Sequence, residues 1–121
     1  MCDPKPAPPP TPQPALLILC RDLLLGSRIT ATAQSAGVPF RVVRDASRLA
    51  GQVGQRLIVD LNQDGAIDAA AAWKAAGDGE VIGFISHVDS EAIARAREAG
   101  IDQVLARSQF LTRLPNLISS R

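Results

Sequence analysis

Short apolar runs and longer segments with helical signals alternate along the chain. The apolar runs, typical of strands buried on both faces, are residues 15–20, 40–43, 57–61, 81–86 and 104–106. Caps, helix-favouring composition and glycine stops predict longer helices over residues 22–36, 66–76, 90–99 and from 108 onward. Asp45 should cap a shorter helix that carries Leu49 and Val53. Pro115 should break or restart the last helix, because proline lacks an amide N–H.

This alternation predicts one α/β domain over residues 15–121. Strands that alternate with helices form a parallel sheet with right-handed crossovers and helices on both faces. Five strands in a domain of this length fit a flavodoxin-like, doubly wound fold with three α/β/α layers and the strand order 2-1-3-4-5. In this order the first and third strands are neighbours, and their carboxyl ends lie where such folds bind ligands.

Residues 1–14 differ in composition from the rest of the chain. They hold seven of the nine prolines, so we expect a disordered tail without helix or sheet hydrogen bonds. Such a segment is either a linker or a ligand for an aromatic groove, and the composition is compatible with both.

Charge and hydropathy limit the cellular locations and the classes of binding partner that we expect. The 121 residues carry a formal net charge of +1 without a block of like charge, which argues against nucleic acid or an anionic membrane as partner. No apolar run is long enough to span a bilayer, and the N-terminus lacks the pattern of a signal peptide, so we expect a cytoplasmic protein. Cys2 and Cys20 should both be reduced, and the chain offers no spaced set of metal ligands.

The candidate functional residues lie at the carboxyl ends of the predicted strands. Asp60 closes the third apolar run, and Asn62 follows it in a turn-like segment. The candidates after the first, fourth and fifth runs are Arg21, Asp22, Ser86, His87 and Arg107. Because parallel strands end at one edge of the sheet, we expect these side chains to surround Asp60.

Over residues 15–119 the chain resembles the receiver domains of two-component response regulators, the CheY-like superfamily. Asp60 matches the aspartate that accepts the phosphoryl group, and Asn62 matches the residue whose backbone carbonyl helps to bind Mg²⁺. Ser86 matches the switch Ser/Thr, and Arg107 stands where the family has an invariant lysine. The segment EAGIDQVLAR is similar to the family's pattern around its fifth strand. The resemblance implies the doubly wound fold and a signalling role.

The resemblance fails at the family's acidic pair, which holds Mg²⁺. Aligned without gaps, the pair falls on Cys20 and Arg21, and Asp22 comes one residue too late. Mg²⁺ needs hard oxygen ligands, and phosphoryl transfer relies on the metal to neutralise charge. We therefore expect a degenerate pseudo-receiver, in which Mg²⁺-dependent phosphorylation of Asp60 is lost or weak. No cofactor is expected, and Mg²⁺ only if Asp60 does accept a phosphoryl group.

Three interpretations of Asp60 stay open at this point. The carboxylate can be a structural hub that forms salt bridges with Arg21 and Arg107, since arginine forms forked pairs with carboxylates. It can instead be a phospho-acceptor. It can also belong to another ligand site, in which two arginines and one aspartate bind a small anion.

Further features of the sequence have alternative explanations. Residues 60–68 match the first nine positions of an EF-hand calcium loop, but Ala71 replaces the bidentate glutamate. The same residues can form the turn and the cap of the following helix. Trp73 can face the core or a partner. His87 can be a rim residue, because its adjacency to Ser86 does not make a nucleophile–base pair.

The expected function is that of a stand-alone, non-enzymatic signalling module that acts through protein–protein contacts. Its contact surface should combine the helix at 90–99, the fifth strand and the last helix. The partner should be a signalling protein, such as a histidine kinase or an output protein, and a homodimer is also compatible. The first alternative is a functional receiver, phosphorylated on Asp60 in a two-component phosphorelay, with self-phosphotransfer as its sole catalysis. The second is a small anion- or nucleotide-binding domain of flavodoxin-like fold.

Overall fold

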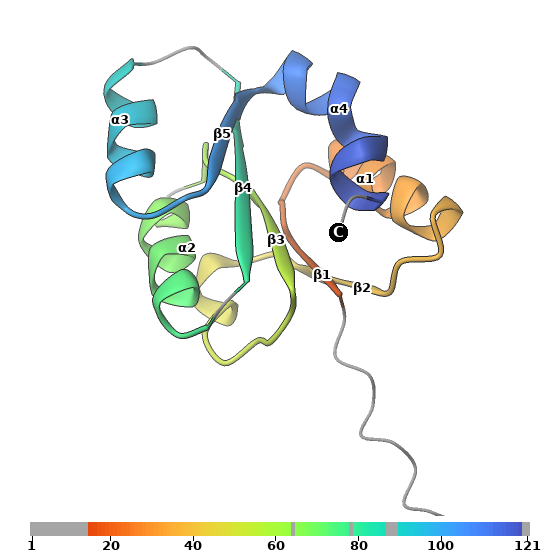
Figure 1. The fold of residues 1–121 in the computed structure, drawn as a ribbon, viewed down its shortest axis with the longest axis horizontal. Coiled ribbons are helices and arrows are strands. Elements are labelled where there is room, and N and C mark those ends of the chain that lie inside the picture. The colour runs from red at the N-terminus through yellow and green to blue at the C-terminus, as the bar shows by residue number, and fades with distance from the viewer. Residues whose placement is uncertain (1–14, 64, 78, 87–89, 120–121) are drawn as a thin grey trace, which may run out of the picture.

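The structure, a computed structural model, describes residues 15–63, 65–77, 79–86 and 90–119. It contains a five-stranded parallel sheet in the order β2-β1-β3-β4-β5 (Figure 1). The strands are β1 (Leu16–Leu19), β2 (Phe40–Val43), β3 (Arg56–Asp60), β4 (Glu80–Ile85) and β5 (Gln103–Ala106). The helices are α1 (Leu23–Ser35), α2 (Ala66–Ala75), α3 (Ser90–Glu98) and α4 (Arg107–Ser119), with the short 3-10 helix η1 (Ala46–Arg48) after β2. The predicted flavodoxin-like, doubly wound fold is confirmed.

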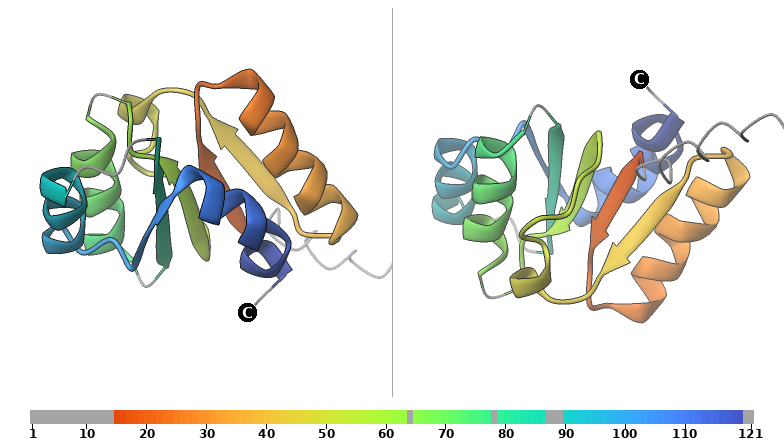
Figure 2. Two further views of the ribbon diagram at one scale, coloured as in Figure 1. Left: turned by 90° about the horizontal axis from the view of Figure 1, so that it is seen from above. Right: turned by 90° about the horizontal axis from the view of Figure 1, so that it is seen from below.

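The sheet is the middle of three layers (Figure 2). Helices α1 and α4 cover one face, and η1, α2 and α3 cover the other. Successive residues of β1 point to opposite faces: Leu16 and Ile18 pack beneath α1 and α4, whereas Leu17 and Leu19 pack beneath α2. All four are almost completely buried, so the apolar runs in the sequence reflect burial on both sides of the sheet.

The first helix is capped as the sequence predicts. Asp22 Oδ1 accepts hydrogen bonds from the backbone N–H groups of Leu24 (3.0 Å) and Leu25 (3.1 Å). Leu25, Ile29 and Ala33 are buried along one face of α1. The cap therefore occupies one oxygen of a carboxylate that lies at the carboxyl edge of the sheet.

The helix expected after Asp45 is reduced to η1, a single turn of three residues. Asp45 does cap it, by accepting a hydrogen bond from the Ser47 backbone N–H (3.1 Å). Leu49 and Val53 both lie after η1, which corrects the expectation that the helix carries them; Leu49 is buried, whereas Val53 is 52% exposed. After the cap at Leu49, Gly51 takes a φ of 82° in the turn that the Gln52 N–H closes on the Leu49 carbonyl (3.1 Å). The rest of the connection to β3 is loop, with a hollow on each side of it.

The last helix continues through Pro115, and this corrects the expectation of a break or restart there. The helix also begins at Arg107, one residue before the expected start at residue 108. Its buried face carries Phe110, Leu114 and Ile118. An internal proline costs about 3 kcal/mol, and the burial of three large apolar side chains offsets a cost of that size.

Some expectations concern residues outside the described part. They are the tail at residues 1–14, the rim residue His87, and Asp64 within the calcium-loop pattern. Among the described residues, none of the helices is long and apolar enough to cross a membrane.

Candidate functional site

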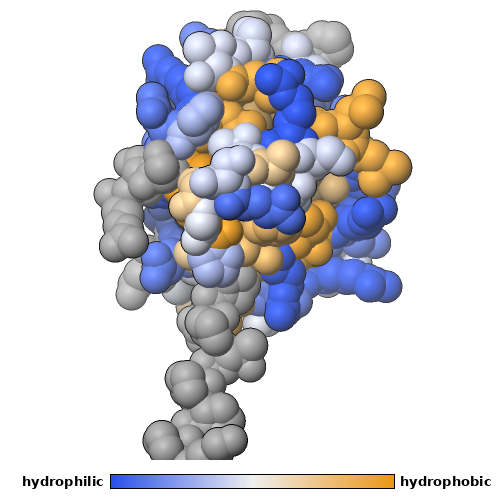
Figure 3. Space-filling model, turned by 90° about the vertical axis from the view of Figure 1, so that its right-hand side faces the viewer, coloured by the Kyte–Doolittle hydropathy of each residue, from blue (hydrophilic) through white to orange (hydrophobic). Residues whose placement is uncertain are grey.

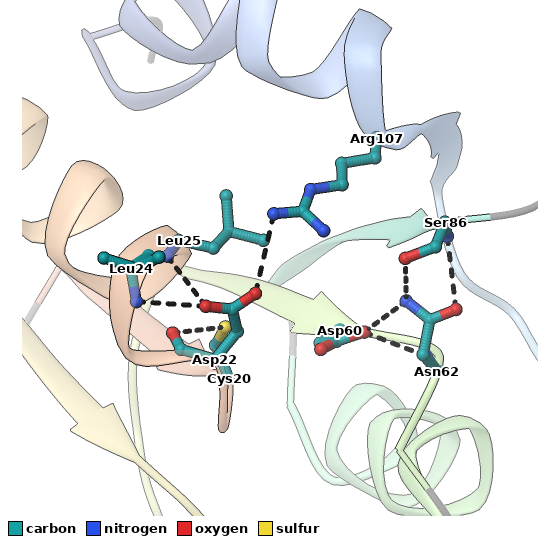
Figure 4. A network of polar contacts seen from close by, with 8 residues as sticks. All are labelled: Cys20, Asp22, Leu24, Leu25, Asp60, Asn62, Ser86 and Arg107. Carbon is teal, nitrogen blue, oxygen red and sulfur yellow. Dashed lines mark hydrogen bonds and ion pairs between the residues drawn. The ribbon is translucent and has the colours of Figure 1, made fainter.

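Asp60 ends the central strand β3 and is the one buried charged residue of the described part, at 8% exposed. Its Oδ1 atom accepts two hydrogen bonds from Asn62, from the backbone N–H (2.9 Å) and from the side-chain Nδ2 (2.7 Å) (Figure 4). Hydrogen bonds to a charged acceptor are roughly twice as strong as those between neutral groups. Asn62 therefore holds the carboxylate in a defined orientation at the carboxyl edge of the sheet.

The Asn62 side chain also joins β3 to the end of β4. Its Nδ2 donates to Ser86 Oγ (3.1 Å), and its Oδ1 accepts from the Ser86 backbone N–H (3.2 Å). Asp60, Asn62 and Ser86 form one polar network, hereafter the amide bridge. This role of the Asn62 side chain was not predicted. The signal for it was the Asp-x-Asn spacing, because such side chains commonly bond within two residues of their own position.

Arg107 and Asp22 form a separate ion pair beside the amide bridge. Arg107 Nη2 lies 3.5 Å from Asp22 Oδ2, while Asp22 Oδ1 caps α1. Both oxygens of Asp22 are thus engaged, one with the first turn of α1 and one with the first residue of α4. Both side chains are partly exposed, so the ion pair contributes at most about 1 kcal/mol.

Asp60 pairs with neither arginine, which corrects the hypothesis of a salt-bridge hub. Within the described residues no ion pair includes Asp60. Arg107 reaches the more exposed Asp22, where a guanidinium loses less hydration than it would beside a buried carboxylate. The two N–H groups of Asn62 bond to Oδ1 of Asp60 instead.

Arg21 is directed toward β2. Its Nε donates to the backbone carbonyl of Arg44 at the end of β2 (3.3 Å). Cys20, the preceding residue, is buried in the core beneath α1 and α4. Arg21 itself is exposed, and it follows the buried Cys20 just after β1 ends.

The Cys20 thiol occupies the other position that aligns with the family's acidic pair. It donates a hydrogen bond to the backbone carbonyl of Asp22 (3.6 Å). Burial raises the pKa of the Cys20 thiol to about 11, and the negative charges of Asp60 and Asp22 act in the same direction. The thiol is therefore protonated at neutral pH and offers no anionic ligand.

The donor set around Asp60 does not fit Mg²⁺, which prefers several oxygen ligands in an octahedral array. The neighbouring positions hold the protonated Cys20 thiol, an Arg21 that bonds to the Arg44 carbonyl, and an Asp22 whose two oxygens are both engaged. In the part of the chain that the structure describes, no group of three or more acidic, cysteine or histidine side chains is arranged to hold a metal.

Two further sequence features have a structural explanation. The calcium-loop pattern contains the turn before α2, in which Gly65 takes a φ of 75° and precedes Ala66, the first helical residue. Trp73 is buried, and its Nε1 donates to the backbone carbonyl of Gln52 (2.9 Å). Trp73 therefore belongs to the core, where its indole N–H ties α2 to the loop before β3.

Comparison with known proteins finds the same fold at low sequence identity. No family profile and no curated protein matches the sequence. Many solved structures are similar to it, and these include the following three. The phosphorylated cyanobacterial phytochrome response regulator RcpA has a TM-score of 0.70 and 13% identity, over 88% of this chain and 89% of that one. A response regulator from Thermotoga maritima has a TM-score of 0.69 and 14% identity, over 89% and 99%. A CheY-like receiver domain protein from Methanospirillum hungatei JF-1 has a TM-score of 0.71 and 11% identity, over 85% and 91%. The chain thus has the fold of response-regulator receiver domains.

Proposed function

We propose that this chain is a receiver-like signalling module that acts through protein–protein contacts, without Mg²⁺-dependent phosphorylation. The likeness in fold supports the signalling role. The loss of Mg²⁺-dependent phosphorylation rests on one observation: the positions of the acidic pair hold a protonated thiol and an exposed arginine that bonds to the Arg44 carbonyl. Phosphoryl transfer relies on a metal to neutralise charge, and this donor set does not suit one.

The amide bridge supports a link between Asp60 and a contact surface. Ser86 lies directly after β4 and is the last described residue before the connection to α3. A change at Asp60 would therefore reach the α3, β5 and α4 side through Asn62 and Ser86. We place the contacts with a signalling partner, such as a histidine kinase or an output protein, on that side.

A second element of contact surface lies at the start of α1. Leu23 and Leu24 are 64% and 81% exposed, next to Asp22 and its ion pair with Arg107. On the side of the molecule that carries α1 and α4, hydrophobic and hydrophilic surface alternate in small patches (Figure 3). Exposed apolar side chains beside charged groups are typical of protein interaction sites, and they support the proposal.

Treatment of the protein with acetyl phosphate and Mg²⁺ tests the loss of phosphorylation. We expect intact-mass spectrometry to show no phosphate adduct. The double variant C20D/R21D rebuilds the acidic pair and should acquire an adduct, because it adds two oxygen ligands beside Asp60. Circular dichroism checks that the variant keeps its fold.

Asp60→Asn is the control for the site of modification. An adduct in the parent protein that is absent from this variant would show that the receiver chemistry operates, and the proposal would then be wrong. The same result would establish the second candidate function, a receiver phosphorylated on Asp60. One observation favours that candidate: both hydrogen bonds to Asp60 use Oδ1, and no described residue donates to Oδ2.

A further inference from the structure

Four arginines line a hollow beside β2 and η1, hereafter the arginine groove. They are Arg21 after β1, Arg41 in β2, Arg44 just after β2, and Arg48 in η1. The hollow measures about 740 Å³, within the range of roughly 300–1,000 Å³ found for small-molecule sites. The connection from β2 to β3 supplies half of its lining, Arg44, Asp45, Arg48 and Gln52.

The lining of the groove carries an unbalanced positive charge. Asp45 is its one acidic residue, so four guanidinium groups and one carboxylate leave a formal charge of +3. The Ser47 N–H that bonds to Asp45 lowers the pKa of that carboxyl, and the charges of Arg21 and Arg48 lower it further. Asp45 therefore stays ionised at neutral pH. Among the described residues, the ion pairs involve none of the four groove arginines.

Two of the four arginine side chains are held by neutral acceptors. Arg21 Nε donates to the Arg44 carbonyl (3.3 Å), and Arg41 Nη1 donates to Gln52 Oε1 (3.0 Å). The side chains of Arg44 and Arg48 donate to no described residue. Guanidinium forks match the oxygens of phosphate groups, and no ion pair among the described residues has to break before an anion binds.

We propose that the arginine groove binds a small polyanion with two or more phosphate groups, either inorganic polyphosphate or a nucleoside polyphosphate. A lining of +3 favours several negative charges over one. The limited size of the groove and the chain's net charge of only +1 favour a small ligand over nucleic acid, which is bound by an extended basic surface. The signal in the sequence was the spacing of Arg41, Arg44 and Arg48, which places one cation on β2 and two on the connection that follows it.

Isothermal titration calorimetry at fixed ionic strength tests the proposal with three probes: tripolyphosphate, ADP and inorganic phosphate. We expect tripolyphosphate or ADP to bind and inorganic phosphate to bind more weakly. If ADP binds and tripolyphosphate does not, the site requires the nucleoside. If tripolyphosphate binds as well, the phosphate groups suffice. The double variant R44Q/R48Q should weaken binding by roughly tenfold or more, since it removes two charge-assisted donors.

The matched control is Arg113→Gln on the exposed surface of α4, which should leave the affinity unchanged. The variant Asp45→Asn should tighten binding, because asparagine keeps the cap of η1 but removes the negative charge. Three results would overturn the proposal. They are the absence of binding by any probe, an equal loss in R44Q/R48Q and in R113Q, and tighter binding of a single-stranded oligonucleotide or an acidic peptide than of ADP and tripolyphosphate.

Discussion

Asn62 touches both other members of the amide bridge, so a single substitution there tests the whole network. We predict that Asn62→Ala lowers the free energy of unfolding by about 1–3 kcal/mol, because the buried Asp60 carboxylate loses its shortest donor. The Ser86 backbone N–H loses its acceptor at the same time. Urea denaturation measures the change.

Asn116→Ala is the matched control, since it removes the same atoms from an exposed position on α4. It should leave the free energy of unfolding close to that of the parent. If both variants lose the same free energy of unfolding, the loss is a general effect of replacing asparagine by alanine, and the amide bridge does not stabilise the fold.

The residues of the amide bridge could be placed from the sequence, but their partners could not. Asp60 and Ser86 close apolar runs, and the ends of such runs mark one edge of a parallel sheet. The directions of Arg21 and Arg107 were not predictable, because a long side chain can reach several acceptors. The acceptor that it contacts depends on the loss of hydration and on the local backbone geometry. A carbonyl at the end of β2 and the carboxylate of Asp22 proved closer than Asp60.

At the scale of elements, the positions of the helices and strands could be predicted from the sequence. The length of η1 and the end of α4 could not. Periodic apolar positions identify a helix or strand, but the effect of a glycine or proline on where the helix ends depends on the surrounding structure. Gly51 takes a positive φ in the turn after η1, whereas Pro115 stays inside α4 because the buried face of that helix offsets its cost.

The contact between α2 and the turn before β4 depends on the absence of a side chain at Gly79. A Cβ atom there would lie 2.1 Å from Trp73 Cη2 and 3.1 Å from the carbonyl oxygen of Gly54. We predict that Gly79→Ala destabilises the protein by about 1–3 kcal/mol, because the indole would have to move from its hydrogen bond to Gln52. Thermal unfolding and the change in tryptophan fluorescence measure the effect.

Gly77→Ala provides the comparison within the same turn, because a Cβ atom at that position meets no atom within 4 Å. This variant should unfold at the parent's temperature or slightly above it, since alanine restricts the unfolded chain. A loss in Gly77→Ala as large as that in Gly79→Ala would contradict a steric origin.

At the scale of the whole molecule, Asp102 connects three elements at the edge of the sheet opposite Asp60. Lys74 Nζ, near the end of α2, lies 2.8 and 3.0 Å from the two oxygens of Asp102, and Val81 N–H in β4 donates to Oδ2 (2.7 Å). Asp102 itself directly precedes β5. Partial burial raises the pKa of Asp102, but the bonds from Lys74 and Val81 outweigh it and lower the pKa below its ordinary 3.8.

This lowered pKa predicts acid sensitivity of the fold. A carboxyl whose pKa is lower in the folded state stabilises that state above its unfolded pKa, and the contribution disappears as the pH falls through the folded value. The parent should therefore lose stability between about pH 5 and about pH 3 more steeply than Asp102→Asn. Thermal midpoints over this range give the slopes. The control is Glu98→Gln, which removes an exposed carboxylate and should lose stability as steeply as the parent. If Asp102→Asn also loses stability as steeply as the parent, Asp102 is not the source of the acid sensitivity.

The packing of α1 against α4 has a consequence for how the chain is made. The buried stripe of α1 lies in one cluster with Phe110, Leu114 and Ile118 of α4, and these elements lie at opposite ends of the folded domain's sequence. During synthesis, β1 and α1 leave the ribosome first, but their apolar face has no cover until α4 follows. The nascent domain therefore carries an uncovered apolar surface through most of its translation, a period in which chaperones and aggregation compete for it.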